Sequence, residues 1–464
     1  MNPHPDLIPL CGGLSPVAGV VAAAAAAGGR ALLVGGCVRD ALMGRACKDI
    51  DIEVYGLPPY ALEKALRARF ELNTVGRSFG VYKIKGADID VSLPRRESKR
   101  GEGHTGFAVQ GDPFMPIAEA SARRDFTVNA IYWDPATGEL IDPHGGVRDL
   151  EARVLRHTSP AFSEDPLRVL RAMQFLARFG FIAAPETVAL CSHIKPENLS
   201  AERVFDEWSK LLLKGVKPSL GLAFLRDCGW VKHFPELEAL IGVEQDPEWH
   251  PEGDVWNHTL HCLDAFARAR LGDPWEDLVV GFAVLCHDFG KAVTTRKEKD
   301  GRWHAYGHEA AGEPLARAFL ERMTRHKDLV DSVLPLVVCH MMPLALWRDK
   351  AGAASIRRLA RRVGRIDRLV RVDDADRRGR PPQDPGDSPQ GAWLLARAEE
   401  LRVKDGAPRR LVLGRHLIAL GHKPGPEFTA VLEEAYEAQL DGAFHDEEAG
   451  IAWLKSRMAR NPLA

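Results

Sequence analysis

Residues 35–54 read GGCVRDALMGRACKDIDIEV, and two features of this stretch decide the fold of the region around it. The first is the glycine pair, which follows the apolar run ALLV at 31–34 and precedes a helix-like segment. Glycine lets the backbone approach a phosphate closely, and free N–H groups at a helix start favour anions. The order of strand, Gly35-Gly36 and helix therefore indicates either a phosphate-binding turn or a tight structural turn.

The second feature is the pair of aspartates in KDIDIEV at 48–54. A strand has a period of two residues, so Asp49 and Asp51 share one face, about 7 Å apart at their Cα atoms. Two like charges this close are unfavourable unless a cation lies between them, and an acidic surface strand is the alternative. Mg²⁺ prefers such oxygen ligands and takes others from water and substrate phosphates. We therefore predict that Asp49 and Asp51 bind Mg²⁺.

A third carboxylate comes from ADIDVSL at 87–93, where Asp90 is the candidate and Asp88, on the same face, is its rival. Three carboxylates beside a phosphate-binding turn are the parts of two-metal nucleotidyl transfer. In that reaction one metal activates an attacking hydroxyl and the other neutralises the triphosphate. Asp49, Asp51 and Asp90 are thus the predicted catalytic residues.

The chain has 464 residues, which favours several domains. Strand-like and helix-like segments are mixed up to about residue 147, and helical periodicity dominates afterwards. Loops near 246–256 and at 380–391 are rich in proline and typical of boundaries. We predict an α/β head at 1–150, an all-α neck and body at 151–245, a second all-α domain at 246–380, and a linker with a helical tail at 381–464.

The bulk composition limits the partners and the compartment. The formal net charge is −2, so a surface for a polyanion must be local. Eight cysteines without a CxxC pair, and no signal peptide, predict reduced thiols in the cytoplasm. The alanine run at 22–27 is too short to cross a membrane, so no membrane partner is expected. The sequence leaves the oligomeric state open.

The order of the head motifs resembles the polymerase-β nucleotidyltransferase superfamily. Residues 35–56 are similar to the first motif of class II tRNA nucleotidyltransferases, the CCA-adding enzymes. Further segments agree with that family in its order: PRRES at 94–98, RRDFTVNAIYWDPATGELIDPHGG at 123–146, EDPLRVLRAMQFLARFGF at 164–181 and SAERVFDEWSKLLL at 200–213.

The resemblance implies a polymerase-β-like head with a mixed sheet, followed by an all-α neck and body. It also implies that CCA, or part of it, is added to tRNA 3′ ends from CTP and ATP with Mg²⁺ and without a nucleic-acid template. The nucleotide-binding residues that it implies are Gly35, Gly36, Arg39, Arg123, Arg124, Asp165, Arg168 and Arg171.

The residue types in SEDPLRVLRAMQF at 163–175 themselves predict a segment that selects the nucleotide base. Ser163 is expected to cap a helix on which Asp165, Arg168 and Arg171 share one face. An aspartate accepts from an exocyclic amine and an arginine donates to ring acceptors, so one pair can read C and A and reject U and G. A salt-bridged helix face is the alternative. The resemblance assigns this template role to Asp165 and Arg168.

Two positions qualify the resemblance. Gln174 stands where the family often has a further arginine, which weakens a phosphate or template contact at that turn. Asp125 follows the two predicted nucleotide-binding arginines in RRDFT, and a structural role is the alternative interpretation of this residue.

The region after residue 250 contains the order H…HD…D in VWNHTLHCLDAF at 255–266, LCHDFGK at 285–291 and RVDDADRRGR at 371–380. Mixed nitrogen and oxygen ligands suit Mn, Ni, Fe, Co or Mg, and a water activated by such a metal can attack phosphorus. The predicted metal ligands are His258, His287, Asp288 and Asp376, with Lys291 placed to hold a phosphate. This part resembles the HD phosphohydrolase superfamily, which implies an all-α HD domain acting on phosphomonoester or 2′,3′-cyclic phosphate ends.

The last ligand of this site is ambiguous between Asp373, Asp374 and Asp376, and the similarity of ADRRGR at 375–380 to the closing segment of the family favours Asp376. Four other side chains are weaker candidates. His308 and His340 either extend the site or are ordinary core or surface histidines, and His261 and Asp264 rank below His258.

RNA contacts are expected from the arginine-dense stretch at 355–380, for which a solvated helix face is an equal alternative. Recognition of tRNA shape by body and tail helices follows from the CCA hypothesis. Two other functions are open: a poly(A) polymerase, and an HD nucleotide phosphohydrolase whose head merely binds RNA. The Gly-rich segment at 99–113 predicts a mobile element that bears on CC-only or A-only addition, and full CCA addition is favoured.

Overall fold

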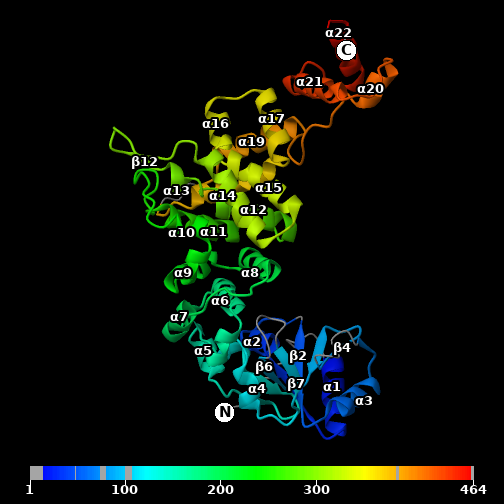
Figure 1. Ribbon diagram of the computed structural model, residues 1–464, viewed down its shortest axis with the longest axis vertical. Coiled ribbons are helices and arrows are strands. Elements are labelled where there is room, and N and C mark those ends of the chain that lie inside the picture. Colours follow the sequence, from blue (N-terminus) through cyan, green and yellow to red (C-terminus); the bar gives the residue numbers. More distant parts are fainter. Residues whose placement is uncertain (1–13, 48, 74–79, 100–106, 383–385, 461–464) are drawn as a thin grey trace. The chain divides into compact units, whose positions relative to one another are not determined.

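The computed structural model describes residues 14–47, 49–73, 80–99, 107–382 and 386–460. The chain forms two compact units, Met1–His233 and Phe234–Ala464 (Figure 1). The first unit holds the head sheet and the helices that follow it, and the second unit is helical. The segment at 99–113 that was predicted to be mobile lies mostly outside the described residues or has no described side chains.

The head contains a seven-stranded sheet of order β3-β4-β5-β2-β1-β8-β9. Strands β2 and β5 run parallel, while the other neighbours run antiparallel, so the sheet is mixed as expected. A separate ribbon pairs β6 with β7. The strands of the head are β1 (Arg30–Val34), β2 (Ile50–Tyr55), β3 (Leu72–Asn73), β4 (Val81–Ile84), β5 (Ile89–Ser92), β6 (Arg95–Lys99), β7 (Phe107–Gly111), β8 (Tyr132–Asp134) and β9 (Glu139–Ile141).

Strand β2 explains why the sheet has one apolar and one chemically active face. Ile50, Ile52 and Val54 are buried in a core with α1 (Leu14–Ala26), α2 (Gly36–Leu42) and α3 (Pro59–Arg67). Because side chains alternate along a strand, Asp51 and Glu53 lie on the opposite face, together with Val34 and Leu32 of β1. Helix α4 (Ile117–Ala122) packs on that second face through Ala120. The alternation in DIDIEV thus separates the core from the candidate site.

The helical part of the first unit follows the head. Its central helix α6 (Leu167–Phe179) packs against α8 (Ala201–Lys214) and α9 (Pro218–Asp227). The remaining elements are η3 (Thr127–Asn129), α5 (Gly146–Glu151), β10 (Val154–Leu155), η4 (Pro160–Glu164), β11 (Ile182–Ala183), α7 (Pro185–Ser192) and η5 (Trp230–His233).

The start of α6 differs from the sequence prediction. Ser163 does not cap α6, because it belongs to η4 and its hydroxyl donates to the Pro160 carbonyl. Asp165 has extended backbone, as expected for a residue before proline, and its Oδ1 accepts from Leu167 N at 3.1 Å. Asp165 therefore precedes the helix instead of lying in its first turn.

The second unit is built from helices with one short two-stranded ribbon. Its elements are α10 (Pro235–Glu238), α11 (Val255–Arg268), α12 (Pro274–Cys286), α13 (Lys291–Thr294), β12 (Arg296–Lys297), β13 (Trp303–His304), α14 (His308–Met323), α15 (Lys327–Cys339), α16 (Met342–Arg348), α17 (Ala353–Val363), α18 (Ile366–Arg378), α19 (Pro389–Glu400), α20 (Gly414–Ala419), α21 (Glu427–Asp441) and α22 (Glu447–Arg460). The last three helices enclose a small core of their own, which includes Leu417, Val431 and Leu454.

Within the described part of the chain, no single helix has the length and apolar character needed to cross a membrane. Helices α15 and α16, which meet at a 41° bend, pass that test only as a pair and by length and composition alone.

Candidate active site

The carboxylates of the head meet at the junction of β2 and β5. Asp51 and Asp90 are direct partners in the parallel register of these strands, and both line a cleft of about 1430 Å³. Asp49 is exposed at the bend before β2. Asp88, the rival of Asp90, is exposed before β5, and its backbone carbonyl accepts from Ile50 N at 2.9 Å. The register thus brings Asp90 to the side of Asp51.

Opposing charges act on these carboxylates. Burial raises the pKa of Asp51, Arg124 opposes that shift, and the carboxylates Asp90 and Asp49 add to it. Lys83 Nζ, on β4, lies 2.9 Å from Asp90 Oδ2. Asp49, Asp51 and Asp90 do not form one of the described groups whose potential ligand atoms all lie within 4.8 Å of one another. The acids are therefore neighbours that Lys83 and Arg124 partly neutralise.

The turn between β1 and α2 requires glycine at its first position. Gly35 has a φ of 82°, and a Cβ built there would lie 3.0 Å from Arg124 Nη1 and 3.5 Å from Asp51 Oδ2. Gly36 begins α2, and Gly35 O accepts the first helical bond from Arg39 N at 3.1 Å. The glycine pair thus lets the chain turn directly beside Arg124 and Asp51.

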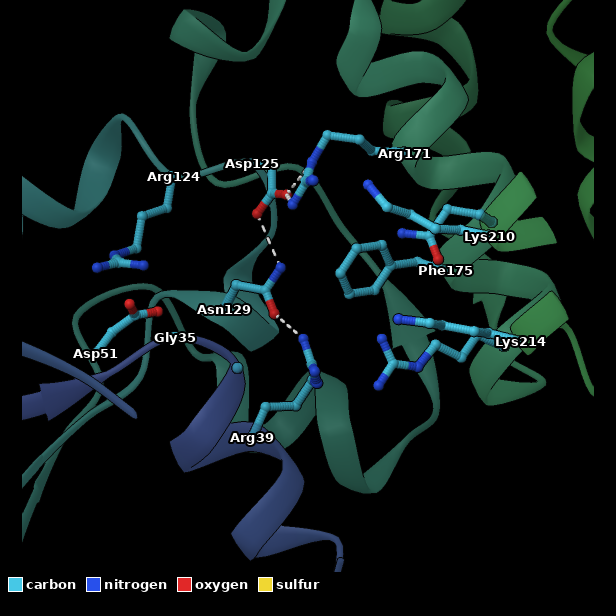
Figure 2. Close-up of a pocket in the computed structure, with 13 residues that line it drawn as sticks. Gly35, Arg39, Asp51, Arg124, Asp125, Asn129, Arg171, Phe175, Lys210 and Lys214 are labelled. Carbon is cyan, nitrogen blue, oxygen red and sulfur yellow. Dashed lines mark hydrogen bonds and ion pairs between the residues drawn. The ribbon is translucent and has the colours of Figure 1, made fainter. Parts of the chain in front are cut away.

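A second cavity of about 290 Å³ adjoins the turn, and we call it the basic pocket (Figure 2). Cationic side chains predominate on its walls, where Asp51 and Asp125 are the carboxylates. These cations are Arg39, Arg124, Arg171, Arg178, Lys210 and Lys214. Lys210 and Lys214 were not predicted, although their spacing of four residues on α8 puts both on one helix face. Arg178 and Asn129 were missed as well.

Asp125 organises the basic pocket from within (Figure 2). Its Oδ2 accepts two bonds from Arg171, at 2.9 Å from Nε and 2.6 Å from Nη2, and its Oδ1 accepts from Asn129 Nδ2 at 2.9 Å. Asn129 Oδ1 in turn accepts from Arg39 Nη1. Although burial opposes it, the Arg171 guanidinium holds the pKa of Asp125 below its usual range. Asp125 thus orients the chain of groups that leads to Arg39.

Aromatic rings lie beside four of these cations, and the rings beside Arg39 and Arg178 are the nearest. The Arg39 guanidinium lies 5.2 Å from the ring centroid of Phe175 and 4.6 Å from that of Phe179. Arg178 lies 4.9 Å from the Phe179 ring as well. Gln174, between these elements, is buried with its Oε1 atom lacking a hydrogen-bond partner. Arg39 is therefore rigidly held, and Gln174 presents an unused acceptor to the same pocket.

The two residues predicted to choose the nucleotide line the large cleft but do not pair with each other. Asp165 Oδ2 accepts from Arg203 Nη2 of α8 at 2.7 Å. Arg168 donates to two backbone carbonyls, at 2.7 Å to Ala161 O and 2.8 Å to Arg123 O. Arg203 was not predicted, because only the packing of α8 against α6 brings it to Asp165.

Glu53 is a buried carboxylate of β2 that was not among the predicted site residues. It accepts from the hydroxyls of Tyr55 at 2.6 Å and Tyr132 at 2.9 Å, and Arg123 Nη2 lies 3.3 Å from its Oε1. The predicted nucleotide-binding Arg123 is thereby tied to β2 at the edge of the large cleft.

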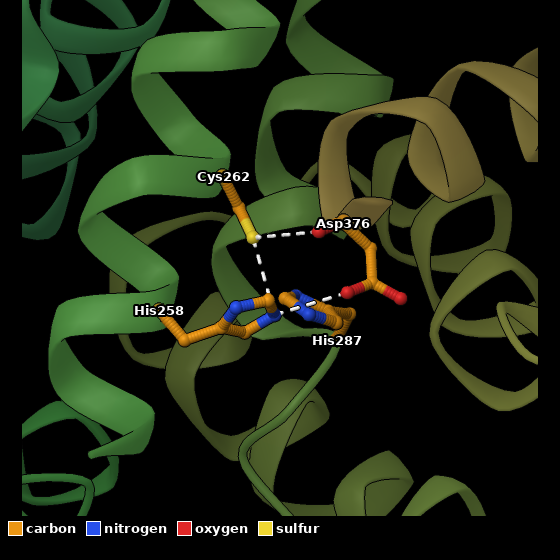
Figure 3. Close-up of side chains that lie close together, drawn as sticks. All are labelled: His258, Cys262, His287 and Asp376. Atoms are coloured by element: carbon orange, nitrogen blue, oxygen red, sulfur yellow. Dashed lines mark hydrogen bonds and ion pairs between the residues drawn. The ribbon is translucent and has the colours of Figure 1, made fainter. Parts of the chain in front are cut away.

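The second unit brings a different set of ligand types together (Figure 3). His258 of α11, His287 at the end of α12 and Asp376 of α18 converge with Cys262, which was not predicted. Asp376 Oδ1 lies 3.0 Å from His258 Nε2, and Cys262 Sγ lies 3.3 Å from the same nitrogen. All four residues are buried, so we call them the first ligand group.

The structure distinguishes the three candidate aspartates of α18. Asp373 accepts from Ser388 Oγ at 3.0 Å, and Asp374 accepts from Arg378 Nε at 2.9 Å. Asp376 alone of the three belongs to a described ligand group. His261 and Asp264, which ranked below His258, belong to none of these groups.

Asp288, His308 and His340 form the second ligand group. His308 Nε2 lies 3.5 Å from Asp288 Oδ1 and 3.2 Å from His340 Nε2. Lys291, the predicted phosphate ligand, places its Nζ 2.7 Å from Asp288 Oδ2 and 2.9 Å from Gln245 Oε1. The two histidines whose role the sequence left open thus lie beside Asp288.

Most of the predicted RNA-contacting arginines at 355–380 join helices of the second unit instead. Arg361 is ion-paired with Glu433 and Glu437 of α21 at 2.6 and 2.5 Å. Arg368 is paired with Glu276 of α12 at 2.7 Å, and Arg371 with Asp277 at 2.5 Å. The alternating acids and arginines therefore hold the unit together, which favours a structural role for this stretch.

Comparison with known proteins identifies the family. Residues 31–156 match the family described as the poly A polymerase head domain, and residues 180–241 match a probable RNA- and SrmB-binding site of polymerase A. A multifunctional CCA protein of Xylella fastidiosa (strain M23) is 38% identical over 380 residues, 79% of this chain and 88% of the relative. One of Xanthomonas campestris pv. campestris (strain B100) is 40% identical over 379 residues, 78% and 88% of the two chains.

Solved structures agree with this result at the level of the fold. The Bacillus stearothermophilus CCA-adding enzyme in complex with CTP has 24% identity and a TM-score of 0.65, covering 96% of this chain and 99% of its own. The Thermotoga maritima CCA-adding enzyme complexed with tRNA has 21% identity and a TM-score of 0.56, and the match covers 95% of this chain and 94% of that enzyme. With 38–40% identity to relatives of which it covers 88%, the chain belongs to the family of multifunctional CCA proteins.

Proposed function

We propose that this protein is a tRNA nucleotidyltransferase that adds C, C and A to tRNA 3′ ends from CTP and ATP. The observation that carries the proposal is the register of Asp51 with Asp90 in a cleft that also reaches Asp165 and Arg168. The candidate metal-binding carboxylates and the candidate base-selecting side chains thus line the same cleft. The relatives named multifunctional CCA proteins, and neighbours solved with CTP, ATP or tRNA, support the same activity.

Asp49, Asp51 and Asp90 offer the oxygen donors that Mg²⁺ prefers. Burial and then the neighbouring carboxylates raise the pKa of Asp51, so a cation beside it would stabilise its charged form. When bound there, Mg²⁺ would activate the tRNA 3′-hydroxyl and offset triphosphate charge. The reaction joins the 3′-oxygen to the α-phosphorus of the nucleotide, loses the hydroxyl proton and releases pyrophosphate. Arg39, Lys210 and Lys214 of the basic pocket would offset the charge of the β- and γ-phosphates.

Base selection would use Asp165 and Arg168 as the template pair. Arg203 fixes the Asp165 carboxylate at 2.7 Å, and the carbonyls of Ala161 and Arg123 fix the Arg168 fork. An aspartate beside an arginine offers an acceptor for an exocyclic amine and donors for ring acceptors. That order suits cytosine and adenine and opposes uracil and guanine.

The test is incorporation of labelled CTP and ATP into tRNAs that end before C74, after C75 or with intact CCA. We expect two C additions and then one A on the first substrate, one A on the second and none on the third. Repeated addition of A to any RNA would instead identify a poly(A) polymerase, and addition of C alone or A alone would identify a partial-specificity enzyme.

A second activity is supported by the two ligand groups of the second unit. We propose that this unit is an HD-type domain that hydrolyses phosphomonoester or 2′,3′-cyclic phosphate ends, with a divalent ion of the Ni, Mn, Co, Fe or Mg series. Buried imidazoles and carboxylates fit such ions, which activate water for attack on phosphorus when bound. Lys291 is the cation beside Asp288 that would hold the phosphate.

The test is phosphate release from RNA with a 3′-phosphate, and ring opening of RNA with a 2′,3′-cyclic phosphate. Loss of both reactions in His287→Ala, with nucleotide addition retained, is the expected result. If neither end is processed by the intact protein with any of these metals, the second activity is refuted while nucleotide addition stands.

A further inference from the structure

Two stacked rings lie in the segment that leads into the second ligand group. The planes of Tyr306 and His304 are 9° apart, and their ring centroids are 5.1 Å apart. Tyr306 is 74% exposed, whereas His304 is half-buried. Because His304 backs the Tyr306 ring and leaves most of it in solvent, we call the pair the aromatic platform. A nucleobase stacks readily on a ring held in this way.

The inner ring of the aromatic platform is fixed by its surroundings. His304 Nε2 lies 3.0 Å from Asp300 Oδ2, and His304 is paired with Arg296 across the ribbon of β12 and β13. A ring that is already ordered loses little conformational freedom when a ligand stacks on its partner. The platform is therefore preorganised.

A series of side-chain contacts connects the ribbon of the aromatic platform with the candidate phosphate-binding lysine. Arg302, in the turn of that ribbon, donates from Nε to Asp246 Oδ2 at 2.6 Å. The preceding residue, Gln245, accepts from Lys291 Nζ at 2.9 Å. Lys291 Nζ in turn lies 2.7 Å from Asp288 Oδ2. The ribbon thus adjoins the cation beside Asp288.

The backbone connects the aromatic platform with the same place from its other side. Tyr306 comes two residues before His308, which begins α14 and whose Nδ1 lies 2.8 Å from Ala305 O. The His308 carbonyl packs directly on Gly290, where an added Cβ would overlap it. Gly290 immediately precedes Lys291 in the chain. The platform is therefore near both the second ligand group and the cation proposed to hold a phosphate.

The charge of the ribbon indicates which ligand carries the base. Arg296 and Lys297 of β12 are exposed, and they are paired with His304 and Trp303 of β13. Cations that flank an aromatic ring suit a single-stranded nucleic acid, whose phosphates and bases they contact together. A free nucleotide offers the same base and terminal phosphate but lacks further backbone phosphates for Arg296 and Lys297.

We propose that the aromatic platform binds the terminal base of an RNA end by stacking on Tyr306, while the terminal phosphate of that end reaches Lys291. The proposal rests on the proposed hydrolysis for the presence of a phosphate at this end. Stacking itself requires neither a metal nor a reaction. Bases of all four kinds have a flat face, so the platform would accept RNA ends of any sequence.

The first test measures stacking in the full-length chain under chelation, so that the RNA end stays intact. The probe is a short RNA with a 3′-phosphate and 2-aminopurine as its terminal base, whose fluorescence falls when it stacks. We expect about tenfold weaker binding and less quenching in Tyr306→Ala, within the range for loss of one base–aromatic stack. Tyr306→Phe keeps the ring and should bind like the parent. Tyr60→Ala, which removes a 77% exposed tyrosine of the head, should change neither quantity.

Unchanged quenching and affinity in Tyr306→Ala would overturn the proposal, and binding to the head cannot hide this result because it is common to parent and variant. Arg296→Ala should weaken binding of the RNA and not of the matching 2-aminopurine mononucleotide. Equal binding of both ligands by Arg296→Ala and the parent would overturn the assignment to RNA in favour of a free nucleotide.

The second test separates stacking from catalysis. In the presence of metal, Tyr306→Ala should raise KM for phosphate release from RNA about tenfold with little change in kcat, the result of losing uniform binding. Its KM for glycerol phosphate, which has no base, should equal that of the parent. Equal losses on both substrates would overturn the proposal by showing a structural effect. Quenching by a parent protein that releases no phosphate would refute the hydrolysis and leave the platform standing.

Discussion

The head site and the ligand groups of the second unit both contain carboxylates, but they differ in burial and in the groups that surround those carboxylates. In the head, Asp51 and Asp90 line an open cleft, and Lys83 and Arg124 partly neutralise them. In the second unit, Asp288 and its histidines are buried, and backbone carbonyls fix most of the imidazoles. The first arrangement suits a cation that arrives with its triphosphate, and the second suits resident ions. This difference in preorganisation is testable.

The largest expected effect is the separation of the two activities by a single head substitution. Asp51→Ala should lower CMP incorporation by about 10³-fold or more, the scale of losing a main electrostatic group at a reacting phosphate. Phosphate release by the second unit should not change, because Asp51 belongs to the other unit. Asp88→Ala is the matched control, since Asp88 is exposed just before β5, and it should retain near-normal incorporation. Equal loss in both variants would contradict the assignment.

The second-largest expected effect is a difference between the two activities in how they recover after metal removal. After dialysis against a chelator and return to buffer with Mg²⁺ alone, nucleotide addition should recover within the mixing time. Phosphate release should stay at least about tenfold reduced until a transition metal is added, because imidazole ligands favour such metals over Mg²⁺. The measurement is the time course of both activities in one sample. Immediate recovery of both with Mg²⁺ would show that the buried site does not require a transition metal.

A smaller effect should follow from Arg203→Ala, which removes the partner of Asp165. We expect about tenfold lower kcat/KM for CTP and ATP and weaker rejection of UTP, since a tenfold loss is about 1.4 kcal/mol of transition-state stabilisation. Arg203→Lys should restore part of the discrimination. Lys195→Ala, in the same cleft but without an assigned role, serves as the control. Unchanged discrimination in Arg203→Ala would limit Arg203 to a structural role.

The sequence predicted the features that depend on local order. Alternation in DIDIEV predicted a strand with one acidic face, and the sheet has that arrangement. The spacing of His287-Asp288 and the later aspartate predicted residues that do converge. Their functional roles remain predictions that the variants above test.

Features that depend on packing between distant elements were not predictable in the same way. Lys210, Lys214 and Arg203 reach the two cavities only because α8 packs on α6. Glu53, which the sequence analysis did not single out, shares a strand face with Asp51, and two tyrosine hydroxyls and Arg123 satisfy it. The predicted start of α6 was wrong for a local reason, since Pro166 disfavours helical backbone at Asp165.

The smallest expected effect concerns the free energy of unfolding of the metal-free protein. The folded state raises the pKa of Asp51, so between the ordinary aspartate pKa and this raised value the folded state binds more protons than the unfolded chain. Stability therefore falls as the pH rises through that window, and the unfavourable contribution is fully present above it. Asp51→Asn should raise the melting temperature by about 1–2 °C above that window, and the difference should disappear as the pH falls below the ordinary aspartate pKa.

Mg²⁺ binding should cancel the same unfavourable contribution in the parent protein, because the ion places a positive charge beside the Asp51 carboxylate. The stabilising effect of Mg²⁺ should consequently be larger for the parent than for Asp51→Asn. Asp88→Asn removes an exposed carboxylate just before β5 and should leave both the melting temperature and the Mg²⁺ response unchanged. A difference in melting temperature between the parent and Asp51→Asn that does not change with pH would mean that the folded state does not disfavour the charged Asp51 carboxylate, and that the head site is as preorganised as the buried one.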